Sequence, residues 1–206
     1  MLAAGCAVAL ALVWCLAELV PAIHLRDAIV LSHFTQLRGP HVNHPLHNLL
    51  HLLDPSLYVL WGVALVALAL ARSRPRVALA IALTLALAPL SAEALKPVLS
   101  HGNAGYQGTR LGISSWPSGH ATAALTLALC AVMAVPSRWR VVTAVVGILF
   151  AAVAGAALLI LEKHMPSDVV GGYLTATMWF ALAVAALRAA ERRWPSPPAA
   201  GTGGQP

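Results

Sequence analysis

The chain has 206 residues, of which 59% are hydrophobic and 10% are charged, and its mean hydropathy is +0.78. This composition excludes a soluble protein with a polar surface and predicts an integral membrane protein. The net charge of +6 does not indicate a nucleic-acid partner, because the longest basic cluster, at residues 72–76, lies between two apolar runs. In that place the positive charge is typical of a membrane protein's cytoplasmic loop.

Six apolar stretches are each near the length that a helix needs to cross a hydrocarbon core of about 30 Å. They are Met1–Val20, Pro55–Ala71, Val77–Leu99, Ser118–Val135, Val141–Leu161 and Val169–Ala190. We interpret the first as a span rather than a cleaved signal peptide, because it lacks a basic start and an Ala-x-Ala site. The sequence therefore predicts an all-α membrane protein with six transmembrane helices, forming one domain over residues 1–194.

The arginines predict the orientation of these spans. Eight of the 13 basic residues lie on one side, at Arg72, Arg74, Arg76, Arg138, Arg140, Arg188, Arg192 and Arg193. Because cytoplasmic loops carry the excess of basic residues, this side is predicted to be cytoplasmic, with both termini inside. We expect a plasma (inner) membrane protein whose tail, residues 195–206, is disordered in the cytoplasm because it is rich in Pro, Gly and Ala.

The longest connection, residues 21–54, is predicted to lie outside. Its leucines recur at helical spacing at Leu46, Leu49, Leu50 and Leu53, so part of it should form an amphipathic helix along the membrane surface. His44, His47 and His51 share one face of that helix, at a spacing that zinc sites use. Only Asp54 joins them, so the ligand count favours interfacial polar residues, and we expect no metal.

Three polar clusters fall at the predicted outer ends of the spans. They are Glu93 with Lys96, the turn Pro117-Ser118-Gly119-His120, and the segment His164 to Asp168. Polar groups near spans are expensive and typically functional. Since three separate segments reach the same depth, we expect them to converge on one site, with Glu93 pairing with Lys96 three positions later.

The second cluster is typical of an anion-binding helix start. Pro117 suits the first turn of a helix, and the amides of Ser118 and Gly119 would lie unpaired at its positive end. His120 follows in the same turn, where it could protonate a group that leaves the bound anion. An ordinary capped helix start is the alternative interpretation of this turn alone.

The third cluster pairs a histidine with a carboxylate. His164 precedes a helix start marked by Pro166, and Asp168 follows four residues after the histidine. A carboxylate there can hold the proton on one ring nitrogen and leave the other nitrogen free as a nucleophile. Together the clusters favour phosphoryl transfer through a phosphohistidine, with no metal or other cofactor.

These motifs resemble the signature of the type 2 phosphatidic acid phosphatase (PAP2) superfamily, whose membrane members are six-span lipid phosphatases. That signature comprises Lys followed seven residues later by Arg-Pro, then Pro-Ser-Gly-His, then Ser-Arg, five residues, His, three residues and Asp. The match covers residues 96–168. The resemblance implies that His164 is the nucleophile, Asp168 its orienting partner and His120 the general acid, with Lys96, Ser118 and Gly119 holding phosphate.

Two arginines of the signature are missing. Asn103 stands seven residues after Lys96, and Leu158 stands six residues before His164. Since an arginine fork on phosphate is strong and geometrically specific, losing both without replacement should lower activity. We predict that Arg110, on a glycine-rich loop, substitutes for one of them; Lys163 is the other candidate, and Arg110 could instead face water or lipid phosphates.

The preferred hypothesis is a metal-independent lipid phosphatase whose site faces outside, acting on a phosphomonoester or pyrophosphate of a membrane lipid. Its expected partners are the lipid phosphate substrate and membrane lipids, with no nucleic acid. An alternative is a catalytically weak relative that binds a phospholipid headgroup. A transporter is disfavoured, because the middle of the fourth and fifth spans offers little beyond threonines.

Overall fold

The computed structural model describes residues 1–99 and 116–194, which form α-helices joined by short connections, with no β-strand among them. The helices are α1 (Leu2–Leu19), α2 (Pro21–Thr35), α3 (Pro40–His51), α4 (Pro55–Ala71), α5 (Pro75–Leu99), α6 (Gly119–Ala134), the short 3-10 helix η1 (Ser137–Trp139), α7 (Arg140–Ile160) and α8 (Pro166–Arg193). Proline occupies the first turn of α2, α3, α4 and α8, where its missing amide costs no helical hydrogen bond.

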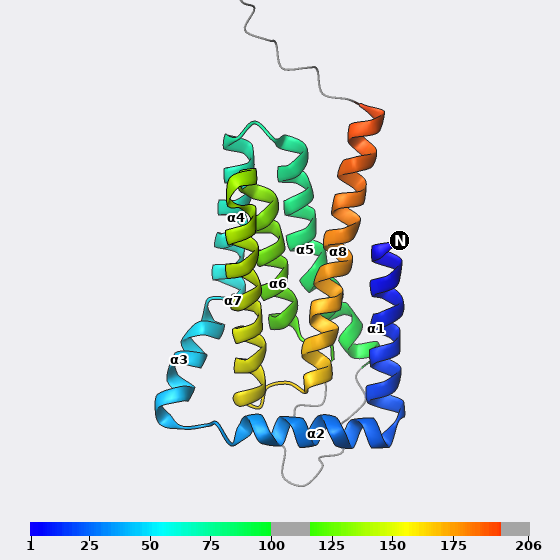
Figure 1. The fold of residues 1–206 in the computed structure, drawn as a ribbon, viewed down its shortest axis with the longest axis vertical. Coiled ribbons are helices and arrows are strands. Elements are labelled where there is room, and N and C mark those ends of the chain that lie inside the picture. The colour runs from blue at the N-terminus through cyan, green and yellow to red at the C-terminus, as the bar shows by residue number, and fades with distance from the viewer. Residues whose placement is uncertain (100–115, 195–206) are drawn as a thin grey trace, which may run out of the picture.

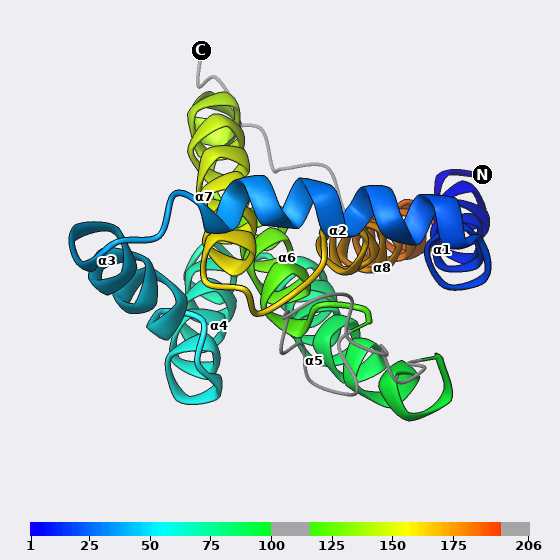
Figure 2. The same ribbon diagram turned by 90° about the horizontal axis from the view of Figure 1, so that it is seen from below.

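Six helices, α1 and α4 to α8, run side by side, and α2 lies across one end of the bundle (Figure 1). Seen from that end, α6 lies inside the bundle, where it packs against α4, α5, α7 and α8 (Figure 2). Small residues permit this packing: a Cβ at Gly147 of α7 would lie 2.7 Å from the Cβ of Ala128 on α6. All six predicted spans are therefore helices, and their ends agree with the predicted ranges to within three residues.

Four of these helices are long and apolar enough to cross a membrane: α1, α5, α7 together with η1, and α8. The consecutive helices α3 and α4 pass the same test only together, and they are bent by 53° relative to each other. At 16 residues, α6 is a shorter apolar helix. In the described part of the chain this gives four spans, or five with the bent pair, so the count of six stays a prediction.

The connection between the first two predicted spans contains two helices. The predicted amphipathic helix is α3, in which Leu50 is buried while His44 and His47 are exposed. Leu53 is also buried, but it lies in the turn after α3, which ends at His51. Within residues 1–99 and 116–194, no three His, Cys, Asp or Glu side chains gather as metal ligands would. The helix α2, which the leucine spacing did not predict, lies across the end of the bundle beneath α7 and α8 (Figures 1 and 2).

Candidate active site

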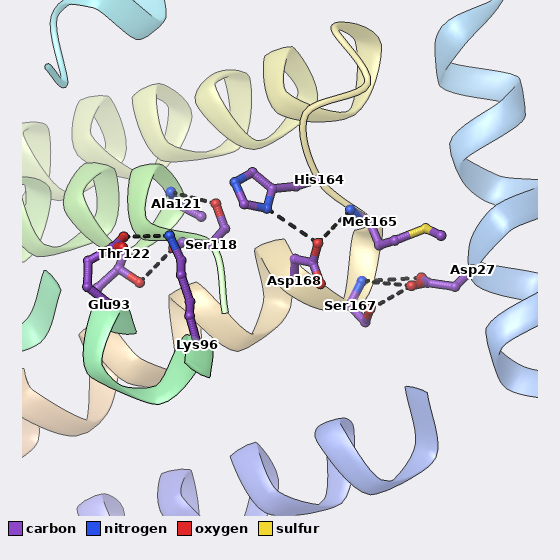
Figure 3. Close-up of polar contacts among 10 residues, drawn as sticks. All are labelled: Asp27, Glu93, Lys96, Ser118, Ala121, Thr122, His164, Met165, Ser167 and Asp168. Carbon is purple, nitrogen blue, oxygen red and sulfur yellow. Dashed lines mark hydrogen bonds and ion pairs between the residues drawn. The ribbon is translucent and has the colours of Figure 1, made fainter. Parts of the chain in front are cut away.

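The three polar clusters lie at the same end of the bundle, the end that α2 crosses. Lys96 belongs to the last turn of α5, Ser118 caps the start of α6, and His164 lies on the short connection from α7 to α8. Figure 3 shows these side chains around one another, with Asp27 of α2 on the far side of the α8 start. The structure thus brings together clusters whose ends, Glu93 and Asp168, are 75 positions apart in the chain, as the sequence predicted.

The pair His164 and Asp168 is formed. The distance from His164 Nδ1 to Asp168 Oδ2 is 3.3 Å, and the same oxygen accepts a 2.8 Å hydrogen bond from the backbone amide of Met165. The side chains of His164 and Asp168 are only 12% and 3% exposed, so water competes little for this contact. The second ring nitrogen of His164 points away from Asp168, toward the side on which Ser118 lies (Figure 3). Asp168 therefore both caps α8 and holds the imidazole.

The start of α6 corrects one expectation. The amide of Ser118 is not free, because it donates a 3.0 Å hydrogen bond to the backbone oxygen of Asp168. The Ser118 hydroxyl is fully buried and accepts from the amide of Ala121, which makes it the cap of α6. Of the two expected amide donors, the Gly119 amide alone has no acceptor among the described residues. Ser118 instead ties the start of α6 directly to the residue that orients His164.

Two glycines of α8 permit this close contact between α6 and α8. A Cβ at Gly172 would lie 2.6 Å from the carbonyl oxygen of Ser118, and one at Gly171 would lie 3.0 Å from the ring of Trp116. The hydroxyl of Thr122 bonds to the carbonyl oxygens of both Ser118 and Gly172. Glycine at these two positions therefore allows the close approach of α6 and α8.

His120 lies in the first turn of α6 and is partly buried. Its ring is within electrostatic range of His164, Lys163, Asp54 and Lys96. Asp54, at the junction of α3 and α4, forms an ion pair with His51. The two histidines of the predicted mechanism thus lie close to each other, and Asp54 lies near His120, which the spacing of the motifs did not predict.

Lys96 and Glu93 form the expected ion pair, with 2.6 Å between Lys96 Nζ and Glu93 Oε1. The pair lies against the start of α6: a Cβ at Gly119 would be 2.5 Å from Glu93 Oε1 and 3.9 Å from Lys96 Nζ. A side chain at this position would require the Glu93 carboxylate to move. The Gly119 amide, Lys96 and Glu93 therefore lie close together. Figure 3 shows Lys96 and Glu93 beside Ser118, at the start of α6.

A model of the PAP2 superfamily matches residues 56–192, which include the whole predicted motif region. The chain belongs to the PAP2 superfamily. Among solved structures it is similar to that described as "Crystal structure of the first transmembrane PAP2 type phosphatidylglycerolphosphate phosphatase from Bacillus subtilis", with a TM-score of 0.77 and 19% identity over 92% of this chain and 98% of that one. No curated protein matches the chain.

The family and the shared fold support a phosphatase function and a multi-pass membrane protein. The all-α membrane fold that the sequence predicted is confirmed. At that level of identity, the solved structure establishes the fold of this chain rather than its substrate.

One of the two positions at which the PAP2 signature would have an arginine lies in the described part of the chain. Leu158, at the position of the third motif's arginine, is completely buried in the apolar core. Arg110, the predicted substitute, lies outside the described residues, as does the tail 195–206. Lys163 is exposed, but it lies within electrostatic range of His120 and so close to the site.

Sequence reasoning missed the contribution of α2. Asp27 accepts hydrogen bonds from Ser167, the neighbour of Asp168, and Arg38 pairs with Glu162, two positions before His164. The available signal was that the connection 21–54 contains only two carboxylates, Asp27 and Asp54. A partly buried carboxylate is expensive without a hydrogen-bond partner, so each of the two should find one.

Proposed function

We propose that this protein is a metal-independent lipid phosphatase that works through a phosphohistidine on His164. One observation carries the proposal: the buried pair of His164 and Asp168 adjoins the start of α6, where Gly119, His120 and Lys96 gather. The pair supplies an oriented nucleophile, and the start of α6 supplies amide and cationic donors for a phosphate.

In the first step the substrate phosphate binds to the Lys96 ammonium and the Gly119 amide. Nε2 of His164 attacks phosphorus, the bond from phosphorus to the leaving oxygen breaks, and His120 gives that oxygen its proton. Asp168 accepts a hydrogen bond from Nδ1–H, which stays on the ring, and its negative charge stabilises the positive charge that the ring gains. Ser118 serves this step indirectly, since it fixes the α6 start to the backbone of Asp168.

In the second step water attacks the phosphohistidine. His120, now without its proton, accepts one from the water, and the nitrogen–phosphorus bond breaks to release inorganic phosphate. His164 and His120 both return to their starting states, so no metal or other cofactor is consumed. Donors aimed at the equatorial oxygens lower the barrier in both steps.

The substrate we propose is a lipid monophosphate or pyrophosphate in the outer leaflet of the plasma membrane. The polar clusters lie at the ends of apolar helices, which is the depth of lipid headgroups, and the basic residues gather near the opposite ends. A cysteine placed at Ser73, in the basic loop, should then be inaccessible to an impermeant thiol reagent from outside. Labelling of that cysteine in intact cells would show that the basic loop faces outside and would contradict the proposed orientation.

A second candidate function is headgroup binding without turnover. The observation that favours it is Leu158, an apolar and buried residue where the PAP2 signature has a phosphate-binding arginine. A binder would retain affinity for lipid phosphates and for vanadate but release no phosphate.

The deciding experiment is phosphate release by the detergent-purified protein from a panel of lipid phosphates with chelator present. The panel should contain phosphatidate, phosphatidylglycerol phosphate and a polyprenyl pyrophosphate. We expect turnover of at least one lipid that survives chelation and is inhibited competitively by vanadate, which mimics the five-coordinate transfer state. Binding without release from any lipid would favour the second candidate, and activity only without chelator would reject the metal-free mechanism.

A further inference from the structure

The connection between α7 and α8, which carries His164, is held at both of its ends by α2 and the residues just after it. At the α7 end, Arg38 Nη1 lies 2.8 Å from Glu162 Oε2. At the α8 end, the carboxylate of Asp27 accepts hydrogen bonds from Ser167. Figures 1 and 2 show α2 crossing the bundle at the point where α7 ends and α8 begins. A single segment therefore fixes both sides of the proposed nucleophile.

The contact of Asp27 is a helix cap supplied from another part of the chain. The amide of Ser167 lies in the first turn of α8, where amides have no partner within the helix. It donates to both oxygens of Asp27 at 3.2 and 3.3 Å, and the Ser167 hydroxyl donates to Asp27 Oδ2 at 2.6 Å. A carboxylate at the positive end of a helix is also favoured by the helix dipole. Asp27 thus fixes the residue that immediately precedes Asp168 (Figure 3).

Apolar packing supports the same contact. Ala28 and Leu31, on the inner face of α2, are buried and belong to one core cluster with Leu161 and Met165, which flank His164 on either side. Burial of a leucine side chain contributes roughly 1.5–3 kcal/mol, so α2 is held in place independently of its charged contacts. The polar contacts of Asp27 and Arg38 are then available to orient the connection between α7 and α8.

We propose that α2 clamps the connection between α7 and α8, and that Asp27 is a positioning residue for the pair of His164 and Asp168. This inference rests on the proposed function, because the catalytic role of that pair is itself proposed. The route is short: Asp27 fixes Ser167, the next residue is Asp168, and Asp168 holds the ring of His164. The family match begins at residue 56, so Asp27 and Arg38 lie outside the part of the chain that the PAP2 model describes.

The kinetic test compares Asp27→Ala with Asp27→Asn. Without the carboxylate, His164 should spend less time in the attacking orientation, so Asp27→Ala should lower kcat by about 10- to 100-fold while KM stays within about threefold. The side-chain oxygen of asparagine can still accept from Ser167, so Asp27→Asn should recover most of the kcat. Ser32→Ala, which removes a hydroxyl from an exposed position of the same helix, is the matched control and should leave both constants unchanged.

A readout without substrate separates this inference from the proposed function. Amide hydrogen exchange of residues 161–168 should rise in Asp27→Ala and not in Ser32→Ala, whatever lipid the protein acts on. If Asp27→Ala does not fold, Arg38→Gln breaks the exposed end of the clamp instead, and exchange should rise near Glu162 with a smaller loss of kcat.

Each outcome is decisive. Faster exchange together with the kcat loss and the asparagine rescue supports the clamp. Unchanged exchange in both Asp27→Ala and Arg38→Gln overturns it even in an active enzyme. Faster exchange with unchanged kcat overturns the positioning role. A wild-type protein without phosphatase activity that still shows the exchange difference rejects the proposed function and retains the clamp as a structural device.

Discussion

Asp168 has two functions in the structure, and a single substitution can separate them. The same oxygen, Oδ2, accepts from the amide of Met165 at 2.8 Å and lies 3.3 Å from Nδ1 of His164. An asparagine whose side-chain oxygen takes this place can keep both hydrogen bonds and lose only the charge. Asp168→Asn should therefore fold as the wild type does and catalyse more slowly.

The size of the loss follows from the charge. A hydrogen bond to a charged group contributes about 1.5–3 kcal/mol, against about 0.5–1.5 kcal/mol for a neutral one, so neutralising Asp168 should cost about 1–2 kcal/mol. That corresponds to a decrease of about 5- to 30-fold in kcat. Asp168→Ala removes the helix cap as well, which should cost a further ~0.5–2 kcal/mol of stability.

The assay is kcat on the preferred lipid phosphate, with thermal unfolding in the same detergent measured in parallel. Glu191→Gln, an exposed acid near the other end of α8, is the matched control for loss of one negative charge. Full activity in Asp168→Asn would show that the carboxylate does not assist His164. An equal loss of stability in Asp168→Asn and Asp168→Ala would show that asparagine does not preserve the cap.

Three further expectations concern other parts of the molecule. Arg110→Ala should lower turnover by about 30- to 1,000-fold if Arg110 replaces a missing arginine. If Arg110→Ala stays within about threefold of wild type and Lys163→Ala shows that loss instead, the role belongs to Lys163. Gly172→Ala should reduce stability by about 1–3 kcal/mol, because its Cβ would meet the backbone at the start of α6, while Gly5→Ala, with open space around it, should be neutral in thermal unfolding. Burial raises the pKa of Asp27 above its ordinary value of 3.8 by more than its hydrogen bonds lower it. The contribution of Asp27 to stability is therefore complete below pH 3.8 and is lost as the pH rises through the raised pKa, so the unfolding temperature of wild type should fall relative to that of Asp27→Asn over this range. A difference in unfolding temperature that does not change with pH would refute this.

Most of the bundle could be predicted because its signals are local. Apolar runs of the right length and prolines at their starts set the helices, and α4 begins and ends where the sequence predicted, at Pro55 and Ala71. The pair of His164 and Asp168 also depends on a local rule, since residues four positions apart at a helix start can meet. The convergence of the clusters then followed from the sidedness of the spans.

What could not be predicted depends on contacts between distant segments. Whether the Ser118 amide is free depends on the carbonyl of Asp168, 50 positions away, and nothing in the local motif specifies that hydrogen bond. The position of α2 is set by the burial of Leu31 against the end of α7 and by Asp27 meeting Ser167, 140 positions away. Its composition alone did not distinguish it from the rest of the surface connection.

The most direct test is whether phosphate becomes attached to His164. Purified protein is mixed with a lipid phosphate labelled on phosphorus and quenched rapidly under alkaline conditions, which preserve phosphohistidine, and the label on the protein is counted. Wild type should carry label that His164→Ala lacks. His120→Ala should accumulate label from substrates with good leaving groups, because attack on such a substrate does not require His120 as an acid, whereas hydrolysis of the phosphohistidine requires His120 as a base. Equal label in wild type and His164→Ala would contradict the assignment of His164 as the nucleophile.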